Sequence, residues 1–269
     1  MTVSVIMGVY NCKSVELLKK SVQSIIDQTY DDWEFIICDD GSTDDTRELL
    51  RKIEKLDKRI RVLSYDKNQG LSFALNTCLK EAKGKYIARQ DDDDVSMKNR
   101  LEKQVDFLDK NKEYNIVGCL ADICNDLVVW GKYKVKERPG REDFFWNSPF
   151  IHPAVMIRKE TYDVVGGYRV SRETRRCEDL DLFMRMYASG SKGYNIQEIL
   201  YSYRLINNPK KKYRPMKYRI DEAIVKYKGY KNMGVLTKGI PYVIKPIVIG
   251  MIPQKIFYKI KQSQYKNIM

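Results

Sequence analysis

The chain has 269 residues and a formal net charge of +13, because 49 lysines and arginines oppose 36 aspartates and glutamates. Hydrophobic residues make up 43% and charged residues 32%, which excludes a disordered or fibrous chain and allows one large domain or two closely fused lobes. The positive charge favours polyanionic partners such as nucleotides, lipid phosphates or nucleic acid, without choosing among them.

The sequence offers few ligands of the kind that a zinc site requires. The six cysteines form no Cys-x-x-Cys pair and His152 is the only histidine, so the sequence argues against a zinc site. Cys38 and Cys78 lie in apolar runs and are expected to be buried thiols in a reducing compartment. The N-terminus lacks the basic segment of a signal peptide, and no apolar stretch reaches the roughly 18 residues of a spanning helix. We therefore expect a cytoplasmic protein.

The first hundred residues alternate strand and helix patterns. Strands are predicted at residues 3–9, 34–38, 60–65 and 85–88, and helices between them at about 18–26, 49–56 and 71–82. Ser42, with Asp45 three residues later, predicts a capping box at the start of the second helix. This order of elements requires right-handed crossovers and predicts an α/β fold with a parallel sheet.

The pattern is weaker in the rest of the chain. We expect a helix at 97–109, a strand at 116–120, an apolar segment at 153–157, a turn at Gly166-Gly167 and a helix at 179–188. Beyond residue 205 lysine, arginine and tyrosine become frequent, as in the run Lys210-Lys211-Lys212. We therefore predict a main domain at 1–205 and a basic, apolar extension at 206–269.

Polar and acidic side chains follow each of the first four predicted strands. They are Tyr10 and Asn11, then Asp39 and Asp40, then residues 68–70, then residues 91–94. In parallel sheets ligands bind outside the carboxyl ends of the strands. The four clusters are therefore expected to converge on one ligand-binding edge.

The acidic run at residues 91–94 is the strongest of these clusters. Four successive carboxylates at a strand end repel one another unless a cation lies among them. A hard divalent cation that also binds two phosphate oxygens would relieve the repulsion. The alternative is a solvated acidic turn before the next helix, where early carboxylates suit the helix dipole. The position at the ligand edge, near Asp40, favours the cation.

Two further acidic segments each allow two interpretations. The stretch 39–44 suits a tight turn with a helix cap, or a carboxylate of Asp40 that accepts the imide N–H of a uracil ring beside Tyr10. Glu178 and Asp179 suit an acidic helix start, or a buried carboxylate that acts as general base on an acceptor hydroxyl. The pattern alone leaves both pairs of alternatives open.

In their order along the chain, these segments resemble family 2 of the glycosyltransferases, of the bacterial surface-polysaccharide type. The matching segments are 3–11, 39–44, 68–71, Ala74, Asn76, 84–94, 100–104, His152-Pro153, 166–168 and 178–182. The resemblance implies the GT-A fold, a Rossmann-like, mostly parallel sheet flanked by helices, here with a short helical basic C-terminal extension. Residues 1–95 would then form the nucleotide-sugar half and 96–205 the acceptor half.

The resemblance also implies a role for each matching position. The nucleotide-sugar-binding residues would be Tyr10, Asp40, Asn68, Gly70, Arg89, Asp91 and Asp92. Asp93 would bind a divalent cation, usually manganese or magnesium. Asp179 would deprotonate an acceptor hydroxyl, which attacks the anomeric carbon opposite the departing nucleoside diphosphate and inverts its configuration.

Other positions depart from the family pattern or stay ambiguous. Gly8 stands where many members have proline, and Cys78 where many have glycine, but neither change removes a chemical group. Residues 172–176 are unusually basic and suit either a loop that closes on the diphosphate or a solvated loop. Arg176 and Glu178 are candidates for the acceptor side or this loop. His152 suits a structural role beside Pro153 as well as contact with the metal, donor or acceptor.

The extension mixes large apolar residues between 240 and 258 with lysines at 238, 245, 255, 259 and 261. This pattern is typical of a segment that lies on an anionic membrane with its lysines at the headgroups. The alternative is helices packed on the catalytic domain, because Pro241 and Pro246 interrupt a continuous amphipathic face.

The resemblance implies a metal-dependent inverting hexosyltransferase that moves a sugar from a UDP-sugar to a hydroxyl of a polyprenyl-diphosphate-linked glycan. It would act at the inner face of the cytoplasmic membrane, in capsule, O-antigen or similar synthesis. One rival is a sugar-nucleotide nucleotidyltransferase, which needs a glycine-rich basic loop where residues 8–13 offer one glycine and one lysine. Another is a non-catalytic sugar-binding or scaffold protein. We expect no nucleic-acid binding, because no recognised module is present.

Overall fold

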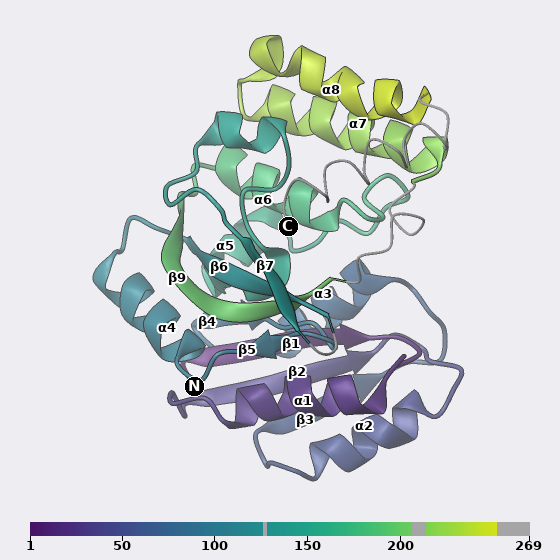
Figure 1. Ribbon diagram of the computed structural model, residues 1–269, viewed down its shortest axis with the longest axis vertical. Helices are drawn as coiled ribbons and strands as arrows, with labels where there is room; N and C mark the ends of the chain where they lie inside the picture. Colours follow the sequence, from purple (N-terminus) through teal and green to yellow (C-terminus); the bar gives the residue numbers. More distant parts are fainter. Residues whose placement is uncertain (126–127, 206–213, 252–269) are drawn as a thin grey trace.

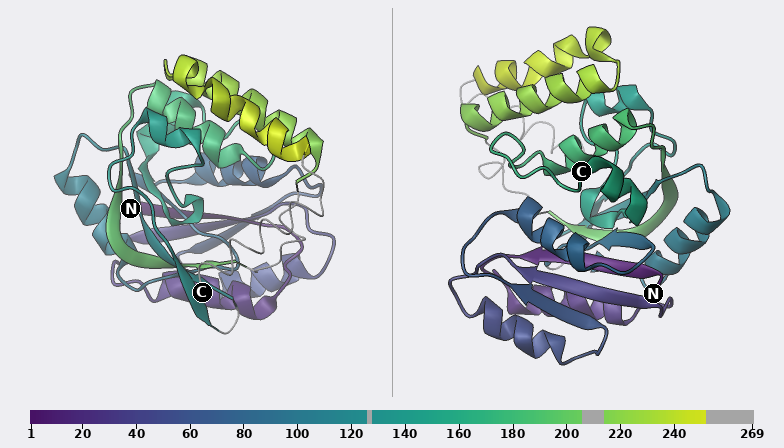
Figure 2. Two further views of the ribbon diagram at one scale, coloured as in Figure 1. Left: turned by 45° about the horizontal axis from the view of Figure 1, so that its top comes forward. Right: turned by 180° about the vertical axis from the view of Figure 1, so that it is seen from behind.

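A computed structural model describes residues 1–125, 128–205 and 214–251. This part of the chain forms an α/β molecule around one nine-stranded sheet (Figure 1). The strand order is β3-β2-β1-β4-β8-β6-β9-β5, and β7 pairs with β6 at the side. The sheet curls between a first half that carries α1, α2 and α3 and a second half covered by α5 and α6 (Figures 1 and 2).

The first half confirms the predicted alternation. Its strands are β1 (Val3–Val9), β2 (Trp33–Asp39), β3 (Ile60–Ser64) and β4 (Tyr86–Arg89), and its helices are α1 (Val15–Ile26), α2 (Thr46–Glu54) and α3 (Leu71–Glu81). All pairings among these strands are parallel. Strand β1 is buried on both faces because Val5 packs toward α1 and α2 while its neighbour Ile6 packs toward α3. The predicted buried thiols Cys38 and Cys78 lie fully inside the core.

The predicted capping box at the start of α2 is wrong. The N-cap residue is Asp45, and its side chain makes no capping hydrogen bond. The Ser42 hydroxyl instead accepts the backbone N–H of Asn11 at 3.0 Å, and the carboxylate of Asp44 accepts the N–H of Thr46 at 3.0 Å. The polar side chains of this turn therefore tie the loop after β2 to the loop after β1, which positions the edge where ligands are expected.

The second half of the sheet is mixed rather than parallel. Its elements are β5 (Val95–Ser96), α4 (Arg100–Lys110), β6 (Ile116–Cys124), β7 (Val129–Tyr133), η1 (Arg141–Phe145), η2 (His152–Ala154), β8 (Met156–Arg158), α5 (Lys159–Val165), α6 (Glu178–Ala188) and β9 (Gly193–Arg204). Strand β8 runs antiparallel to β4 and β6, whereas β9 runs parallel to β6. The sequence pattern did not reveal β7 or the long strand β9, whose side chains alternate only partly in burial.

The described part of the extension forms two helices, α7 (Met216–Asn232) and α8 (Leu236–Met251). Helix α7 packs on α6, and α8 packs on α7 and η1. The Tyr230 hydroxyl donates to the carbonyl of Phe144 at 2.9 Å and Lys238 pairs with Glu142 at 2.7 Å. The interpretation that helices pack on the catalytic domain is therefore confirmed for this part of the extension.

The expectation that prolines interrupt the amphipathic pattern is wrong for α8, which continues as one helix through Pro241 and Pro246. Close packing through Gly239 and Gly250 against α7 offsets the lost backbone donors. Within the described residues, no helix combines the length and apolar character needed to cross a membrane. The lysine run at 210–212 and the apolar and basic residues beyond 251 lie outside the described residues.

Candidate active site

The first pocket lies at the carboxyl ends of the parallel strands and is called here the donor-side pocket. Its volume is about 180 Å³, and its lining residues are Gly8, Tyr10, Asn11, Lys13, Ser14, Leu17, Asp92, Asp93 and Arg204. The structure thus brings the loop after β1 together with the acidic run after β4. Tyr10 is half-exposed at the rim, and the neighbouring Asn11 adopts a left-handed backbone conformation with φ of 45°. This turn gives the chain its sharp exit from β1.

Asp40 organises the loop that carries Asn68 and Gly70. Its buried carboxylate accepts hydrogen bonds from the Tyr65 hydroxyl at 2.5 Å, the Asn68 amide at 2.8 Å and the backbone N–H groups of Gln69 and Gly70 at 2.9 Å each. Gly70 supplies the positive φ of 93° with which this loop enters α3. The structure therefore places Asp40, Asn68 and Gly70 together, with Asp40 as the centre of the cluster.

Arg89 is fully buried and donates to the carboxylate of Asp91 at 2.5 Å. It also donates to the carbonyl of Gln90. Because its guanidinium is enclosed, Arg89 fixes the direction of the acidic run rather than presenting its own charge at the surface. The side chain of Asp91 remains about one-third exposed.

Asp92 and Asp93 line the pocket, and the pKa of each carboxylate is raised. Burial, followed by the charges of Asp93 and Asp91, raises the pKa of Asp92 to about 6. Burial and the charge of Asp91 also raise the pKa of Asp93, which pairs with the guanidinium of Arg204 at 3.3 Å. Carboxylates whose pKa values are raised by burial and by neighbouring negative charges are typical of functional sites.

Whether this cluster suits a divalent cation depends on how many of its oxygen atoms could bind the cation. Among residues 1–125, 128–205 and 214–251, no three acidic, histidine or cysteine side chains converge to hold a metal ion by themselves. Magnesium at phosphate sites is typically held by one or two carboxylates together with phosphate oxygens and water. Asp93, which lines the donor-side pocket, therefore fits a cation whose coordination a bound diphosphate completes.

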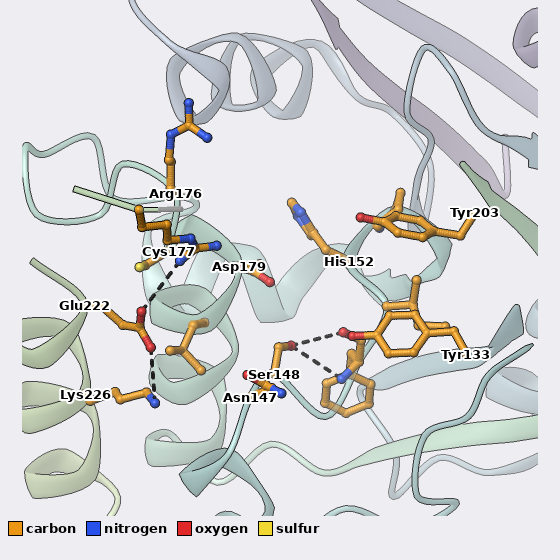
Figure 3. Close-up of a pocket in the computed structure, with 15 residues that line it drawn as sticks. Tyr133, Asn147, Ser148, His152, Arg176, Cys177, Asp179, Tyr203, Glu222 and Lys226 are labelled. Atoms are coloured by element: carbon orange, nitrogen blue, oxygen red, sulfur yellow. Dashed lines mark hydrogen bonds and ion pairs between the residues drawn. The ribbon is translucent and has the colours of Figure 1, made fainter. Parts of the chain in front are cut away.

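The second pocket, called here the acceptor-side pocket, is larger and has a volume of about 360 Å³ (Figure 3). Its lining residues are Tyr133, Asn147, Ser148, Phe150, Ile151, His152, Pro153, Arg176, Cys177, Asp179, Leu180, Tyr203, Arg214, Glu222 and Lys226. Asp179 lies in the first turn of α6. Figure 3 shows Asp179 and His152 between Glu222 and Lys226 on one side and Tyr133 and Tyr203 on the other.

The carboxylates at the start of α6 are both perturbed. Burial raises the pKa of Asp179 above its ordinary value. Burial and then the charge of Asp179 raise the pKa of Glu178 to about 7. A raised pKa makes a carboxylate a stronger base, so Asp179 is suited to accept a proton from a bound hydroxyl.

His152 is held by Tyr168. Its Nε2 shares a hydrogen bond of 2.8 Å with the Tyr168 hydroxyl, and burial lowers the pKa of the imidazole well below its usual value. Tyr168 is itself fixed by two hydrogen bonds between its backbone and the side chain of Asn76. The predicted Gly166-Gly167 turn is confirmed, since both glycines have positive φ. His152 therefore faces the pocket as a neutral ring within a fixed scaffold.

Arg176, a predicted candidate for the acceptor side, lines this pocket beside a wall formed by residues of the extension, which the sequence analysis missed. Arg176 has a left-handed backbone conformation with φ of 66°, and its guanidinium lies 5.6 Å from the centre of the Tyr218 ring of α7. Glu222 of α7 pairs with Lys226 at 3.3 Å and with Arg214 at 3.6 Å. The spacing of Glu222 and Lys226 on a helix, four residues apart, is the one signal in the sequence that could have suggested this pair.

The two pockets meet at the end of β9. Tyr203 lines the acceptor-side pocket and the next residue, Arg204, lines the donor-side pocket. Consecutive strand residues point to opposite faces. The backbone N–H of Arg204 also donates to the carboxylate of Asp94 at 2.7 Å, which anchors β9 to the acidic run. One strand end thus separates a pocket that contains Asp92 and Asp93 from a pocket that contains Asp179.

Residues 4–174 match the family described as "Glycosyl transferase family 2". The chain therefore belongs to glycosyl transferase family 2. EpsE of Bacillus subtilis is 37% identical over 266 residues, which are 98% of this chain and 95% of that protein. A UDP-Gal:alpha-D-GlcNAc-diphosphoundecaprenol beta-1,3-galactosyltransferase of Escherichia coli is 31% identical over 234 residues, 85% of this chain and 83% of that one.

The crystal structure of S. aureus TarS in complex with UDP-GlcNAc has a similar fold. The TM-score is 0.71 at 17% identity, over 91% of this chain and 73% of that one. This likeness confirms the predicted GT-A fold. The family match ends at residue 174, so it includes the acidic run but neither Asp179 nor the wall formed by α7.

Proposed function

We propose that the protein transfers a sugar from a UDP-sugar to a hydroxyl of a polyprenyl-diphosphate-linked glycan, with inversion at the anomeric carbon. The transfer would take place at the inner face of the cytoplasmic membrane, in the synthesis of a surface polysaccharide. The observation that carries the proposal is the juxtaposition at β9 of an acidic pocket and a pocket that contains Asp179.

On the donor side, Tyr10 and Asp40 would contact the uracil base, with Asn68 and Gly70 beside it. Asp40 already accepts several hydrogen bonds, so the base would share a carboxylate oxygen with the loop at residues 65–70. Asp93 would hold manganese or magnesium, which neutralises the leaving diphosphate when bound, and Asp91 and Asp92 would contact the ribose, the sugar or water bound to the metal. Arg204, which pairs with Asp93 and lines the same pocket, would donate hydrogen bonds to a diphosphate oxygen.

On the acceptor side, Asp179 would accept the proton of the attacking hydroxyl. The new bond forms between that oxygen and the anomeric carbon while the bond to the diphosphate breaks on the opposite side, which inverts the configuration. The electron pair of the breaking bond leaves with the nucleoside diphosphate. Asp179 is partly buried in the pocket, which limits its contact with bulk water.

The cations of the acceptor-side pocket suit an acceptor that carries a diphosphate. Arg176, Arg214 and Lys226 line this pocket and are opposed by the carboxylates of Asp179 and Glu222. Arginine and lysine bind phosphate oxygens through charge-assisted hydrogen bonds. The E. coli relative, whose name specifies a GlcNAc-diphosphoundecaprenol acceptor, supports the same class of acceptor.

Ligand-induced shifts in melting temperature test the donor class. The full chain is heated with each member of a panel of nucleotide sugars, with and without manganese, beside an Asp93→Ala variant. We expect stabilisation by a UDP-sugar that requires manganese in the wild type and is weakened in the variant. Stabilisation by a nucleoside triphosphate instead would favour a nucleotidyltransferase, and no shift with any nucleotide would favour a scaffold protein.

A further inference from the structure

Helices α7 and α8 lie at the end of the molecule opposite α1 and α2 (Figures 1 and 2). Helix α7 exposes four large apolar side chains, each between 37% and 49% accessible: Met216, Ile220, Ile224 and Tyr227. Their spacing of four, four and three residues places them on one face of the helix. Exposed apolar residues are common when scattered singly, but a continuous stripe requires an explanation.

Helix α8 repeats the same pattern. Its exposed apolar residues are between 48% and 72% accessible: Ile240, Ile244, Val248 and Met251. Pro241 and Pro246 do not interrupt this stripe, because the helix is continuous through both. We call these eight residues of α7 and α8 together the apolar stripe.

The two rows of the apolar stripe face away from the catalytic core. Helix α7 turns its other side to α6, where Gly229 lies against Met184, while α8 contacts α7 through Gly239 against Tyr230 and through Gly250 against Met216. The helical period then places both rows on the side of the helix pair that is turned away from α6.

The surroundings of the stripe are basic. Lys217, Lys231 and Lys238 are exposed on or beside the two helices. Helix α8 contains no acidic residue, and the acidic residues of α7 are turned inward, since Asp221 is buried and Glu222 lines the acceptor-side pocket. The described surface of the two helices is therefore apolar and cationic, with no exposed carboxylate.

We propose that the apolar stripe is a docking surface for an anionic lipid bilayer. Aliphatic side chains in a helical row, with lysines beside them, are suited to the boundary between headgroups and acyl chains. The net charge of +13 attracts the protein to such a surface. In this arrangement α7 and α8 lie in the plane of the bilayer and do not cross it.

Docking through this surface also orients the acceptor-side pocket. The side of α7 opposite the stripe carries Glu222 and Lys226, which line that pocket. The pocket wall and the bilayer are then separated by about one helix diameter, on the order of 10 Å. This consequence rests on the proposed function, because it requires that the acceptor is lipid-linked. At this distance from the bilayer, the pocket would receive acceptor hydroxyls close to the diphosphate rather than hydroxyls at the far end of a long glycan.

The test is co-sedimentation of the full chain with vesicles, in the absence of donor and acceptor. Vesicles of phosphatidylcholine with phosphatidylglycerol are compared with vesicles of phosphatidylcholine alone. The triple variant Ile240→Ser, Ile244→Ser, Val248→Ser removes the row on α8, and the double variant Ile220→Ser, Ile224→Ser removes the row on α7. The control, Val164→Ser with Val170→Ser, changes exposed apolar residues outside both helices.

We expect binding to the anionic vesicles that weakens as salt is added, and partition coefficients at least about tenfold lower for both stripe variants but not for the control. Melting curves establish that each variant is folded. If a stripe variant does not fold, Lys217→Glu with Lys231→Glu replaces it, with the same weakening expected.

Equal vesicle binding by folded stripe variants would overturn the inference, as would an absence of binding by the wild type. A dimer that dissociates in the stripe variants would assign the surface to a second copy of the chain and also overturn it. Because the assay contains no substrate, its result is independent of whether glycosyl transfer is observed.

Discussion

At the scale of single residues, Asp179 is the residue of the acceptor-side pocket that we propose as the base. The residue is partly buried in the first turn of α6, and desolvation of the carboxylate raises its pKa. The neighbouring helix α5 offers a matched comparison, because Glu160 is also a first-turn carboxylate but is exposed and lines neither pocket. Glu160 is therefore a matched control for the proposed role of Asp179 as base.

Asp179→Asn should abolish transfer while donor binding is kept, because the amide retains the shape but accepts no proton. We expect a loss of about 100-fold or more in kcat, measured as product formed from a UDP-sugar and a lipid-linked acceptor. Glu160→Gln should leave the rate unchanged. Full activity of Asp179→Asn would eliminate this residue as the base.

Glu178→Gln should stabilise the protein at high pH. The pKa of Glu178 is about 7 in the folded state against an ordinary value of 4.5, so the folded state loses stability as the pH rises through this window. Glutamine carries no charge and removes this cost. We expect a gain of about 1 to 3 kcal/mol near pH 8 and almost none near pH 4.5, measured by urea unfolding. A gain that is equal at both pH values would exclude the electrostatic cause.

Lys226→Met should impair recognition of a diphosphate-bearing acceptor. Methionine keeps the apolar stem of this buried lysine but removes the ammonium that pairs with Glu222 at 3.3 Å. We expect KM to rise about tenfold for a lipid-diphosphate acceptor and to stay unchanged for the same sugar on a neutral lipid. Lys228→Met is the control, since Lys228 is exposed and pairs with Glu173. An equal rise for both acceptors would indicate a structural role.

At the scale of elements, the loop after β3 depends on one carboxylate of the loop after β2. Asp40 accepts hydrogen bonds from Tyr65, Asn68, Gln69 and Gly70 and thereby joins two strand ends. The structure uses the same device elsewhere, where Asn76 of α3 fixes the backbone of Tyr168. Polar side chains that are buried or partly buried thus set the positions of loops that carry little regular structure.

Asp40→Asn should destabilise the fold, because one carboxylate oxygen becomes an N–H group that faces other donors. We expect a loss of about 2 to 3 kcal/mol in the free energy of unfolding, together with weaker UDP-sugar binding. Tyr65→Phe removes a single hydroxyl and should cost about 1 kcal/mol. The exposed Asp45→Asn should change stability little. A neutral result for Asp40→Asn would show that the loop is held by other contacts.

The parallel half of the fold was predictable from the sequence because its strands are apolar on both faces and alternate with amphipathic helices. The second half was less predictable, since β9 is only half-buried and pairs with β6 through irregular register shifts near Leu120. The capping-box prediction was wrong because Ser42 bonds to Asn11, a contact between residues far apart in sequence. Local patterns do not contain such tertiary contacts.

The candidate site divides in the same way. The acidic run, Asp40 and Asp179 were found from their positions next to predicted elements, and their chemical roles remain predictions. Arg204, Glu222 and Lys226 were missed, because only the meeting of β9 and α7 with distant loops gives these residues a common location. The extension contributes to a pocket that the sequence assigned to the main domain alone.

At the scale of the whole molecule, three parts lie in order from one end of the molecule to the other. The parallel half, the mixed half and the pair α7 and α8 follow one another along the molecule (Figure 1). The donor-side pocket lies mainly in the parallel half, the acceptor-side pocket lies between the mixed half and α7, and the apolar stripe lies on α7 and α8. Family membership is shown by the match to residues 4–174, and the arrangement accounts for how a member without a described spanning helix would reach a lipid-linked acceptor.

The most direct test of the central claim is the anomeric configuration of the product. The full chain is incubated with an α-linked UDP-sugar, manganese and a synthetic lipid-diphosphate GlcNAc acceptor, and the product is analysed by mass spectrometry and NMR. The account predicts one added hexose in a β linkage and release of UDP. An α-linked product would contradict a single displacement assisted by Asp179, and no product with any nucleotide sugar from folded protein would contradict glycosyl transfer itself.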